Sequence, residues 1–277
     1  EATAHIQDDR AASGGDITIM KGRRIRAGVG EGKAVAFQTP LSFLGGIDPG
    51  TGEILDPECE CRGTSVAGTV LCFPYGKGST VGSYSMYQLR VNGLAPTAIV
   101  NTSAEPIVAT GAIMSSIPMV DGVDVSLIRS CDHAVVDADK GTVELRDVRE
   151  RHVVTDILRH KGRILLLKRS DSVGSYRGQW AGVSGFIEPG ESPEAAAVRE
   201  LEEELGLQGL RPTRVITPES FRDGEVVWTV HASLFDVKGP KVRTDWEHQA
   251  HEWVRPEDVS RYATVPGLQR LVCRLLG

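Results

Sequence analysis

The segment from Gly185 to Leu207, GFIEPGESPEAAAVRELEEELGL, constrains the fold more than any other part of the chain. Ser192 is a favourable N-cap, and Pro193 suits the first helical position because its missing N–H is not needed there. Gly206 suits the C-terminal stop. The sequence therefore predicts a helix over Pro193–Leu205. With 3.6 residues per turn, three carboxylates fall within one narrow arc of this helix, namely Glu200, Glu203 and Glu204.

Carboxylates on one arc of a helix repel each other, and a divalent hard cation removes that repulsion. Ligation by oxygen alone favours Mg²⁺ or Mn²⁺ over zinc. Because Mg²⁺ keeps waters and usually completes its shell with substrate phosphates, a small phosphorylated substrate is expected. We therefore predict a metal site at Glu200, Glu203 and Glu204. A solvated acidic helix face is the alternative.

A longer pattern decides between these two interpretations. The segment fits G-x5-E-x7-R-E-U-x-E-E-x-G-U, where U is aliphatic, at every fixed position: Gly185, Glu191, Arg199, Glu200, Leu201, Glu203, Glu204, Gly206 and Leu207. It thus resembles the Nudix hydrolase signature. The resemblance implies magnesium-dependent hydrolysis of a diphosphate linked to another group. Glu200, Glu203 and Glu204 would bind the metal, Glu203 or Glu204 would act as the base, and Arg199 would bind substrate or orient a carboxylate.

Further residues of the second half also look typical of this family. Arg169 and Gly178-Gln179-Trp180 precede the signature, and Glu247 could serve as a further metal ligand or base, with a surface glutamate as the alternative. The aromatic residues Trp180, Phe221 and Trp228 either stack on a base or belong to the core. Because aromatics in such strands are more often buried, we favour the core.

The pattern around the signature predicts an α/β/α sandwich. Strands are expected at 153–158 and 163–168, joined by a hairpin turn at His160-Lys161-Gly162, and at 226–235. A second amphipathic helix is expected at 267–276. Strands with helices on both sides of the signature suggest two helical layers on one sheet.

A chain of 277 residues, 40% hydrophobic and 25% charged, is expected to form two globular domains. The pattern changes near Arg146–Arg151. We therefore predict a two-domain α/β protein with a disordered tail at 1–16, a first domain at 17–148 and a second at 149–277. The tail has no apolar stretch typical of a secretory signal, and Met20 is a plausible natural start.

The first half is rich in glycine and short strands. Strands are expected at 33–37, 65–73, 98–101 and 118–120, with helices at 79–92 and 105–115. Before the first helix lies Gly76-Lys77-Gly78-Ser79-Thr80. Glycines allow backbone N–H groups to converge on an anion, and a helix N-terminus favours negative charge. The order of a nucleotide-binding P-loop fails, however, because Gly78 follows Lys77.

Four segments of the first half resemble, in order, the small swivelling subunit of the aconitase X group, above all archaeal phosphomevalonate dehydratases: 45–54, 74–84, 95–101 and 104–122. The resemblance implies a swivelling β/β/α domain that caps a separate large subunit carrying an iron–sulfur cluster. Together they would dehydrate mevalonate 5-phosphate in isoprenoid biosynthesis. Ser79 would be the catalytic base, with Lys77 and Gly78 binding substrate. Asn101, Glu105 and Pro106 either bind substrate or brace the loop, and we favour bracing.

Composition excludes several classes of function. The first 148 residues hold 12 Lys and Arg against 18 Asp and Glu, and the remainder holds 19 of each, so nucleic acid is not an expected partner. No apolar run is long enough for a membrane span. Five irregularly spaced cysteines indicate a reducing cytoplasm rather than a disulfide framework. Neither Cys59-Glu60-Cys61 nor the pair His248 and His251 has enough ligands for zinc.

Three hypotheses follow. In the first, the chain joins a dehydratase small subunit to an active Nudix hydrolase. In the second, the hydrolase is active and the first half is only a binding or regulatory module. In the third, the Nudix domain is a non-catalytic sensor of a diphosphate metabolite. The fusion suggests a prenyl diphosphate as substrate or signal, and a nucleotide diphosphate is the alternative.

Overall fold

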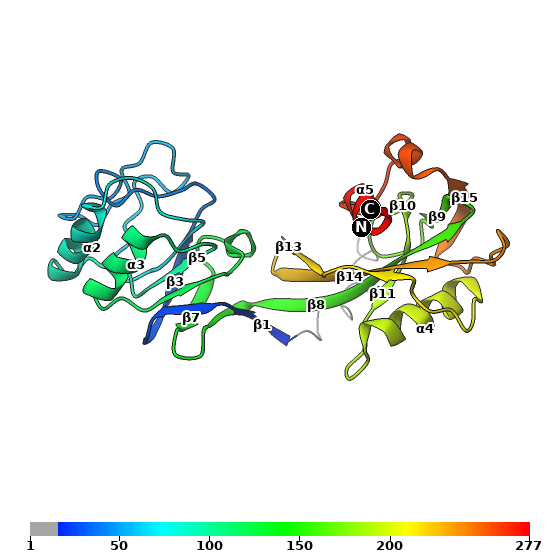
Figure 1. Cartoon of the computed structure of the whole chain (residues 1–277), viewed down its shortest axis with the longest axis horizontal. Coiled ribbons are helices and arrows are strands. Elements are labelled where there is room, and N and C mark those ends of the chain that lie inside the picture. Colours follow the sequence, from blue (N-terminus) through cyan, green and yellow to red (C-terminus); the bar gives the residue numbers. More distant parts are fainter. Residues whose placement is uncertain (1–15) are drawn as a thin grey trace, which may run out of the picture. The chain divides into compact units, whose positions relative to one another are not determined.

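The computed structural model describes residues 16–277, so the predicted disordered tail at 1–16 lies outside the described residues except for Asp16. The chain divides into two compact units (Figure 1). The N-terminal unit contains Asp16–Glu150 together with Phe221–Val227, and the C-terminal unit contains Arg151–Ser220 and Trp228–Gly277.

A parallel sheet forms the centre of the N-terminal unit. Its strands are β1 (Asp16–Lys21), β2 (Arg23–Arg26), β3 (Val29–Ala36), β4 (Val70–Phe73), β5 (Ala98–Asn101), β6 (Met119–Asp121), β7 (His133–Asp137) and the first part of β8 (Thr142–His160). Strands β3, β4, β5 and β6 are parallel neighbours, whereas β2 pairs antiparallel with β6. Strand β7 pairs antiparallel with both β3 and β8, and β1 with β8. The helices are α2 (Gly82–Val91), α3 (Pro106–Met114) and the short η1 (Val125–Leu127).

The parallel sheet of this unit is buried on both faces. Successive side chains of a strand point to opposite faces. In β4, Val70 and Cys72 belong to one hydrophobic cluster, and Leu71 and Phe73 belong to the other. Helices α2 and α3 cover the second face, where they lie side by side in Figure 1. This arrangement is the predicted β/β/α architecture.

The segment Phe221–Val227 belongs to the N-terminal unit although it is distant in sequence. Val227 packs in the hydrophobic cluster of β4 and β7. The buried Arg222 guanidinium donates to both carboxylate oxygens of Asp132 at 3.1 Å, and Arg129 donates to the Gly224 carbonyl at 3.3 Å. The domain boundary predicted between residues 148 and 149 does not anticipate this segment.

The C-terminal unit is a sheet between helices. Its strands are the remainder of β8, β9 (Arg163–Arg169), β10 (Trp180–Ala181), β11 (Val183–Phe186), β12 (Arg214–Val215) and β15 (His248–Val254), together with the parts of β13 (Glu219–Asp223) and β14 (Val226–Asp236) that lie outside Phe221–Val227. Its helices are α4 (Pro193–Leu205), η2 (Pro256–Arg261) and α5 (Leu268–Leu276). Strands β8 and β9 form the predicted hairpin. Strand β8 continues through Arg146–Arg151, where the sequence pattern changes.

Two hydrophobic cores lie on opposite faces of this sheet. In β9, Leu165 and Leu167 pack with α4, whereas Ile164 and Leu166 pack with α5 and η2. The predicted α/β/α sandwich is therefore confirmed. Helix α4 has the predicted bounds, and α3 is flanked by the predicted terminal residues Glu105 and Ser115.

Several predicted boundaries were wrong, and two of them have a clear local cause. The helix predicted to begin at Ser79 begins at Gly82, because residues 79–81 form a turn in which the Gly82 N–H donates to the Ser79 carbonyl. The strand predicted to begin at Ser65 begins at Val70, because the Thr69 N–H closes a turn onto the Val66 carbonyl.

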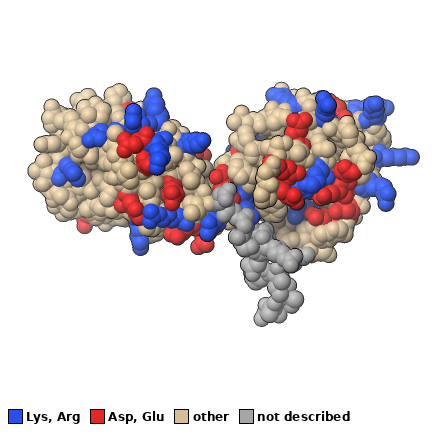
Figure 2. Space-filling view, turned by 90° about the horizontal axis from the view of Figure 1, so that it is seen from below, with Lys and Arg blue, Asp and Glu red and all other residues tan. Residues whose placement is uncertain are grey.

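The surface of Figure 2 mixes charges of both signs. Asp and Glu lie among Lys and Arg on this face of each unit, without a continuous basic patch. This distribution agrees with the lack of a basic excess in either half of the sequence. Within residues 16–277, no helix has the length and apolar composition that crossing a membrane requires.

Candidate functional site

Helix α4 is fixed at both ends by the residues that the sequence indicated. The Ser192 hydroxyl accepts a hydrogen bond from the Ala195 N–H at 3.2 Å, and Pro193 occupies the first turn. Gly206 ends the helix in the left-handed region at φ 67°, and its N–H donates to the Glu202 carbonyl. The buried face packs on the sheet through Ala196, Ala197, Leu201 and Leu205, which sets the rotation of the glutamates about the helix axis.

Arg199 organises the acidic residues around it. Its guanidinium makes a bidentate pair with Glu191 at 3.0 and 2.9 Å and donates to Glu200 Oε1 at 2.6 Å. A further N–H donates to the Phe186 carbonyl at 2.9 Å. Hydrogen bonding to Arg199 lowers the pKa of Glu191. Of the two predicted roles of Arg199, the structure supports the orientation of Glu200, and substrate binding stays a prediction.

Gly185 is required by the position of Glu200. A Cβ atom at Gly185 would overlap the Glu200 carboxylate, so a larger residue there would displace this carboxylate from its observed position. Burial raises the pKa of Glu200, and the hydrogen bond from Arg199 lowers it in part. The first glycine of the signature and Glu200 are therefore in close steric contact.

Glu204 is the most deeply buried of the three glutamates, with 4% of its surface exposed. Its Oε1 accepts a long hydrogen bond from the Ser184 N–H at 3.4 Å, whereas Oε2 is buried without a hydrogen-bond partner. Nε2 of the buried His248 lies 3.5 Å from Oε2. Burial raises the pKa of Glu204 well above its usual range, and the charges of Glu200 and Glu247 raise it further.

The loop before β15 adds two acidic residues to this cluster. Asp245 accepts hydrogen bonds from the Glu247 N–H at 3.0 Å and from His248 Nδ1 at 3.2 Å. Burial raises the pKa of Glu247, and the neighbouring charges of Asp245 and Glu203 add to the effect. The position of Glu247 supports its predicted role as a further ligand or base.

Glu203 differs from its neighbours because its side chain is 60% exposed. It contacts Arg199 at 3.4 Å and otherwise extends into solvent. The three predicted carboxylates thus form a gradient, from buried Glu204 through Glu200 to exposed Glu203. A reactant that approaches from solvent meets Glu203 first.

The chemistry of this cluster fits a divalent cation. The ligand atoms are carboxylate oxygens, burial and mutual repulsion raise the pKa values of Glu200, Glu204 and Glu247, and Glu204 Oε2 has no hydrogen-bond partner. A cation relieves both the repulsion and the unpaired oxygen. Within residues 16–277, no three carboxylate, imidazole or thiolate groups already lie at the spacing of a metal site. Glu200, Glu203, Glu204 and Glu247 are the residues that would bind it.

In the N-terminal unit, Lys77 is held by two acidic residues. Its ammonium lies 2.9 Å from Glu58 Oε2 and 3.2 Å from Asp56 Oδ2. Hydrogen bonds to these carboxylates raise the pKa of Lys77, so the lysine stays charged. The backbone of the loop is also fixed, because the Lys77 N–H donates to the Leu41 carbonyl at 2.9 Å.

Ser79 follows a backbone conformation that favours glycine. Gly78 has φ +101°, and a Cβ atom there would approach the Ser42 hydroxyl closely. The Ser79 side chain is exposed, and its Oγ accepts a hydrogen bond from the Val81 N–H at 3.3 Å. Ser79 thus lies three residues before helix α2, in a turn rather than in the first turn of the helix.

Asn101 and Glu105 make contacts beside the Gly-Lys-Gly-Ser loop. Glu105 caps α3 by accepting from the Ile107 and Val108 N–H groups at 2.9 and 2.8 Å, and a Cβ atom at Gly76 would collide with it. Asn101 donates to the Phe73 carbonyl at 2.7 Å. These contacts favour bracing for Asn101 and Glu105, and their role stays a prediction.

Comparisons with known proteins decide the family. Residues 19–145 match the model described as the aconitase X swivel domain, and residues 148–275 match the NUDIX domain. The phosphomevalonate dehydratase small subunit of Thermococcus onnurineus is 56% identical over 128 residues, which are 46% of this chain and 98% of that protein. That of Methanocella arvoryzae is 51% identical over 129 residues, again 46% and 98%. The chain belongs to the aconitase X swivel family, and its second half is a NUDIX domain.

Solved structures similar to each half are known. Aconitase X of Thermococcus kodakaraensis in its holo-form is 55% identical, covering 46% of this chain and 98% of that chain with a TM-score of 0.46. The MutT protein of Methanosarcina mazei Go1 is 27% identical, covering 46% of this chain and 94% of that chain with a TM-score of 0.40. We now call the N-terminal unit the swivel unit and the C-terminal unit the Nudix unit.

Sequence reasoning missed Asp156 in the Nudix unit. This residue lies in the middle of β8, fully buried, and neither carboxylate oxygen has a hydrogen bond. Burial raises the pKa of Asp156 to about 8, the charge of Glu200 raises it further, and nearby Ser233 lowers it only in part. A single Asp inside the apolar pattern 153–158 was the available signal.

The predicted aromatic residues of the Nudix unit lie in different environments. Trp180 packs against the core and meets Tyr262 edge-on at 5.3 Å between ring centroids, which confirms the core interpretation for this residue. The ring centroids of Trp228 and Phe186 lie 6.0 Å apart, and Trp228 is partly buried. Trp246, which sequence reasoning did not consider, is 62% exposed beside Glu247.

Proposed function

We propose that the Nudix unit is a Mg²⁺- or Mn²⁺-dependent hydrolase that cleaves a diphosphate linked to another group. The main support is the buried Glu204 carboxylate. Its Oε2 has no hydrogen-bond partner, and the charged groups around it, such as Glu200 and Glu247, are also negative. Such an arrangement is costly unless a cation completes it. The complete Nudix signature around it supports catalysis over the sensor hypothesis.

The protein residues would have distinct roles in this reaction. Arg199 and Gly185 hold Glu200 in place, and the Ser184 N–H holds Glu204. Glu203 or Glu204 would take the proton of the attacking water while the bond between phosphorus and the leaving oxygen breaks. The cation, when bound, would polarise a phosphoryl oxygen and acidify the water. Exposed Glu203 is reached from solvent, whereas Glu204 is reached only through the cluster.

The test follows the products of hydrolysis, phosphate monoesters together with inorganic phosphate, from a panel of diphosphates supplied with Mg²⁺, including nucleotide sugars, ADP-ribose, dinucleotides and isopentenyl diphosphate. Wild type is compared with Glu203→Gln and Glu204→Gln. Hydrolysis of the prenyl compound, lost in both variants, would join the two halves in one pathway. Preference for a nucleotide would reject that link while keeping the enzyme. No turnover of any compound would favour the sensor.

We infer that the swivel unit is the small subunit of a dehydratase whose iron–sulfur cluster resides in a separate large subunit. The match to small subunits over 98% of their length supports this role. Exposed apolar side chains surround the start of α2 and suit a protein partner: Leu44, Tyr75, Val81, Tyr84 and Tyr87. Mevalonate 5-phosphate is the proposed substrate.

Ser79 is the proposed base of this dehydration, with Lys77 and Gly78 in contact with substrate. A serine hydroxyl is a weak base in water, so its alkoxide needs donors and positive charge around it. The swivel unit supplies the Val81 N–H and the backbone of a braced loop. Because Asp56 and Glu58 neutralise Lys77, the remaining stabilisation would come from the partner subunit.

Co-purification tests this role. The chain is expected to form a stable complex with a cluster-bearing large subunit, and the complex, but neither part alone, is expected to dehydrate mevalonate 5-phosphate. Failure to bind such a subunit would favour the regulatory-module hypothesis. All five cysteines are free, which supports the proposed cytoplasmic location.

A further inference from the structure

A cavity that is open to solvent lies on the α4 side of the Nudix unit, at the end of the helix opposite to its cap at Ser192. It has a volume of about 560 Å³, a size typical of small-molecule sites. Its wall is formed by the end of α4, by the loop between β14 and β15, and by the outer strand β15. The residues that line it do not include the glutamates of the proposed metal site.

The cavity combines two kinds of surface. One part is apolar and consists of Leu205, Leu207 and Val242. The other part carries the basic side chains of Lys241, Arg243 and His251, all exposed to solvent. None of the described residues lining it is acidic, and within residues 16–277 no ion pair is formed by Lys241 or Arg243.

The basic side chains lie in an otherwise acidic neighbourhood. Two residues after Arg243 the same loop carries Asp245 and then Glu247, which belong to the glutamate cluster. If Lys241 and Arg243 served to balance these carboxylates, they would be expected to form ion pairs with them. Their position along the cavity instead leaves them available to an anion that enters it.

We propose that this cavity binds a phosphate monoester carrying a short apolar group, as a second ligand site of the Nudix unit. The phosphate would pair with Lys241 and Arg243, and the apolar group would lie on Leu205, Leu207 and Val242. A bare phosphate would leave the apolar wall wet, whereas a purely apolar ligand would leave the cations unused. The site does not depend on the proposed hydrolysis, because it requires neither the metal nor the glutamates.

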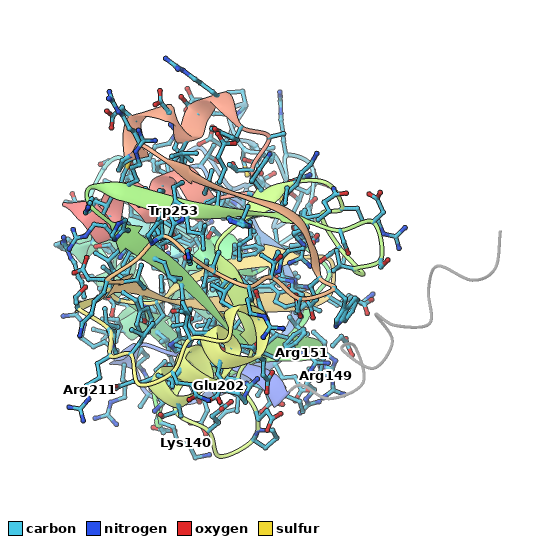
Figure 3. All side chains as sticks on the ribbon, turned by 90° about the vertical axis from the view of Figure 1, so that its right-hand side faces the viewer. Lys140, Arg149, Arg151, Glu202, Arg211 and Trp253 are labelled. Atoms are coloured by element: carbon cyan, nitrogen blue, oxygen red, sulfur yellow. The ribbon has the colours of Figure 1, made fainter. Side chains whose placement is uncertain are left out.

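Trp253 provides a reporter of this cavity. Its indole Nε1–H donates to the Pro240 carbonyl at 2.8 Å, and Pro240 also lines the cavity. Its ring packs in the same hydrophobic cluster as Leu207 and Val242. Figure 3 labels Trp253 on β15 together with Glu202 on α4. A ligand that fills the cavity is therefore expected to change Trp253 fluorescence, and Trp253→Phe identifies its share of the signal.

The test is calorimetric titration of the full chain with methyl, propyl and pentyl monophosphate in EDTA, which removes any metal-bound phosphate. Affinity is expected to rise about fourfold for each buried methylene. Adenosine 5′-monophosphate is expected to bind more weakly than pentyl phosphate. Affinity that is independent of alkyl length, or stronger binding of the nucleotide, would overturn the proposal.

Charge-matched variants localise the site. Lys241→Ala combined with Arg243→Ala is expected to weaken pentyl phosphate binding at least tenfold. Lys238→Ala combined with Arg211→Ala removes the same charge from exposed residues that do not line the cavity, and Arg211 projects from the surface in Figure 3. This control is expected to change affinity less than twofold. Equal losses in both would reject the cavity, whereas retained binding in Glu204→Gln would separate it from the hydrolase.

Discussion

Two sites of the molecule differ in charge balance: the glutamate cluster of the Nudix unit and the Gly-Lys-Gly-Ser loop of the swivel unit. Glu200, Glu204 and Glu247 are buried or half-buried among like charges, which raises their pKa values. Lys77 instead is neutralised by two carboxylates within 3.2 Å, and Ser79 is exposed. The cluster has an excess of negative charge, whereas the loop is already balanced.

This difference indicates what each site needs before it can work. A buried excess of negative charge is relieved by a cation, which any solution containing Mg²⁺ supplies. A balanced, exposed loop gains nothing from an ion and has to be covered by another surface to exclude water. We therefore expect the Nudix unit to act alone and the swivel unit to act only in a complex.

Substitution of one proposed catalytic residue in either unit is expected to have the largest effect on activity. Glu204→Gln is expected to lower diphosphate hydrolysis by about 10² to 10⁴-fold, because ligand or base is lost. It should leave dehydration by the reconstituted complex unchanged. Ser79→Ala should do the reverse, with a similar loss of dehydration. Rates of both reactions are measured for both variants, and a variant that impairs both reactions would contradict independent sites.

Gly185→Ala tests the steric origin of the cluster. Its Cβ would overlap the Glu200 carboxylate, so hydrolysis is expected to fall about 10² to 10³-fold even though no charged group is removed. Gly239→Ala is the matched control, because no described atom lies within 4 Å of a Cβ there. Steady-state kinetics decide the result, and equal activity of the two variants would reject the account of Gly185.

Arg222→Ala sharpens the definition of the swivel unit. Arg222 is buried against Asp132, a partly buried carboxylate that also accepts a hydrogen bond from the Arg129 N–H at 2.8 Å, so the loss of Arg222 is expected to cost about 1 to 3 kcal/mol. The exposed pair of Arg159 and Asp236 in the Nudix unit is the control, with Arg159→Ala costing up to about 1 kcal/mol. Urea unfolding measures both, and similar losses would show that Phe221–Val227 is not part of the swivel core.

Asp156→Asn gives the smallest expected effect. Since burial raises the pKa of Asp156 to about 8, the folded state binds a proton that the unfolded state releases above about pH 4. Stability contributed by this group is therefore complete at low pH and is lost as pH rises toward 8. Asn mimics the protonated acid, so the variant should be more stable at pH 8 by at least ~1 kcal/mol and nearly unchanged at pH 4. Thermal unfolding in EDTA at both pH values measures the stability of wild type and variant. Equal stability of the two proteins at pH 8 would contradict this prediction.

Much of the Nudix helix could be predicted because its determinants are local. Ser192, Pro193 and Gly206 fix the ends through contacts within a few residues, and the helical period alone places the glutamates. The same holds for α3, which Glu105 caps. Asp56 and Glu58 could not be assigned to Lys77 in this way, because a loop about 20 residues away brings them there.

Long-range packing explains what could not be predicted. Phe221–Val227 joins the swivel unit through Arg222 and Val227, whose partners lie about 90 residues earlier in the chain. The mismatch at Ser79 is smaller and has a local cause. Ser79 has a favourable capping side chain, yet the turn closed by the Gly82 N–H delays the helix by three residues. Neither the helical period nor a sequence motif indicates these contacts.

Titration of the full chain with Mn²⁺, followed by the loss of free-ion electron paramagnetic resonance signal, tests the central claim most directly. We predict saturable binding to wild type, at least tenfold weaker binding to Glu204→Gln, and unchanged binding to Ser79→Ala. Equal binding by wild type and Glu204→Gln would contradict the account, because the buried carboxylate would then have no role in holding a cation.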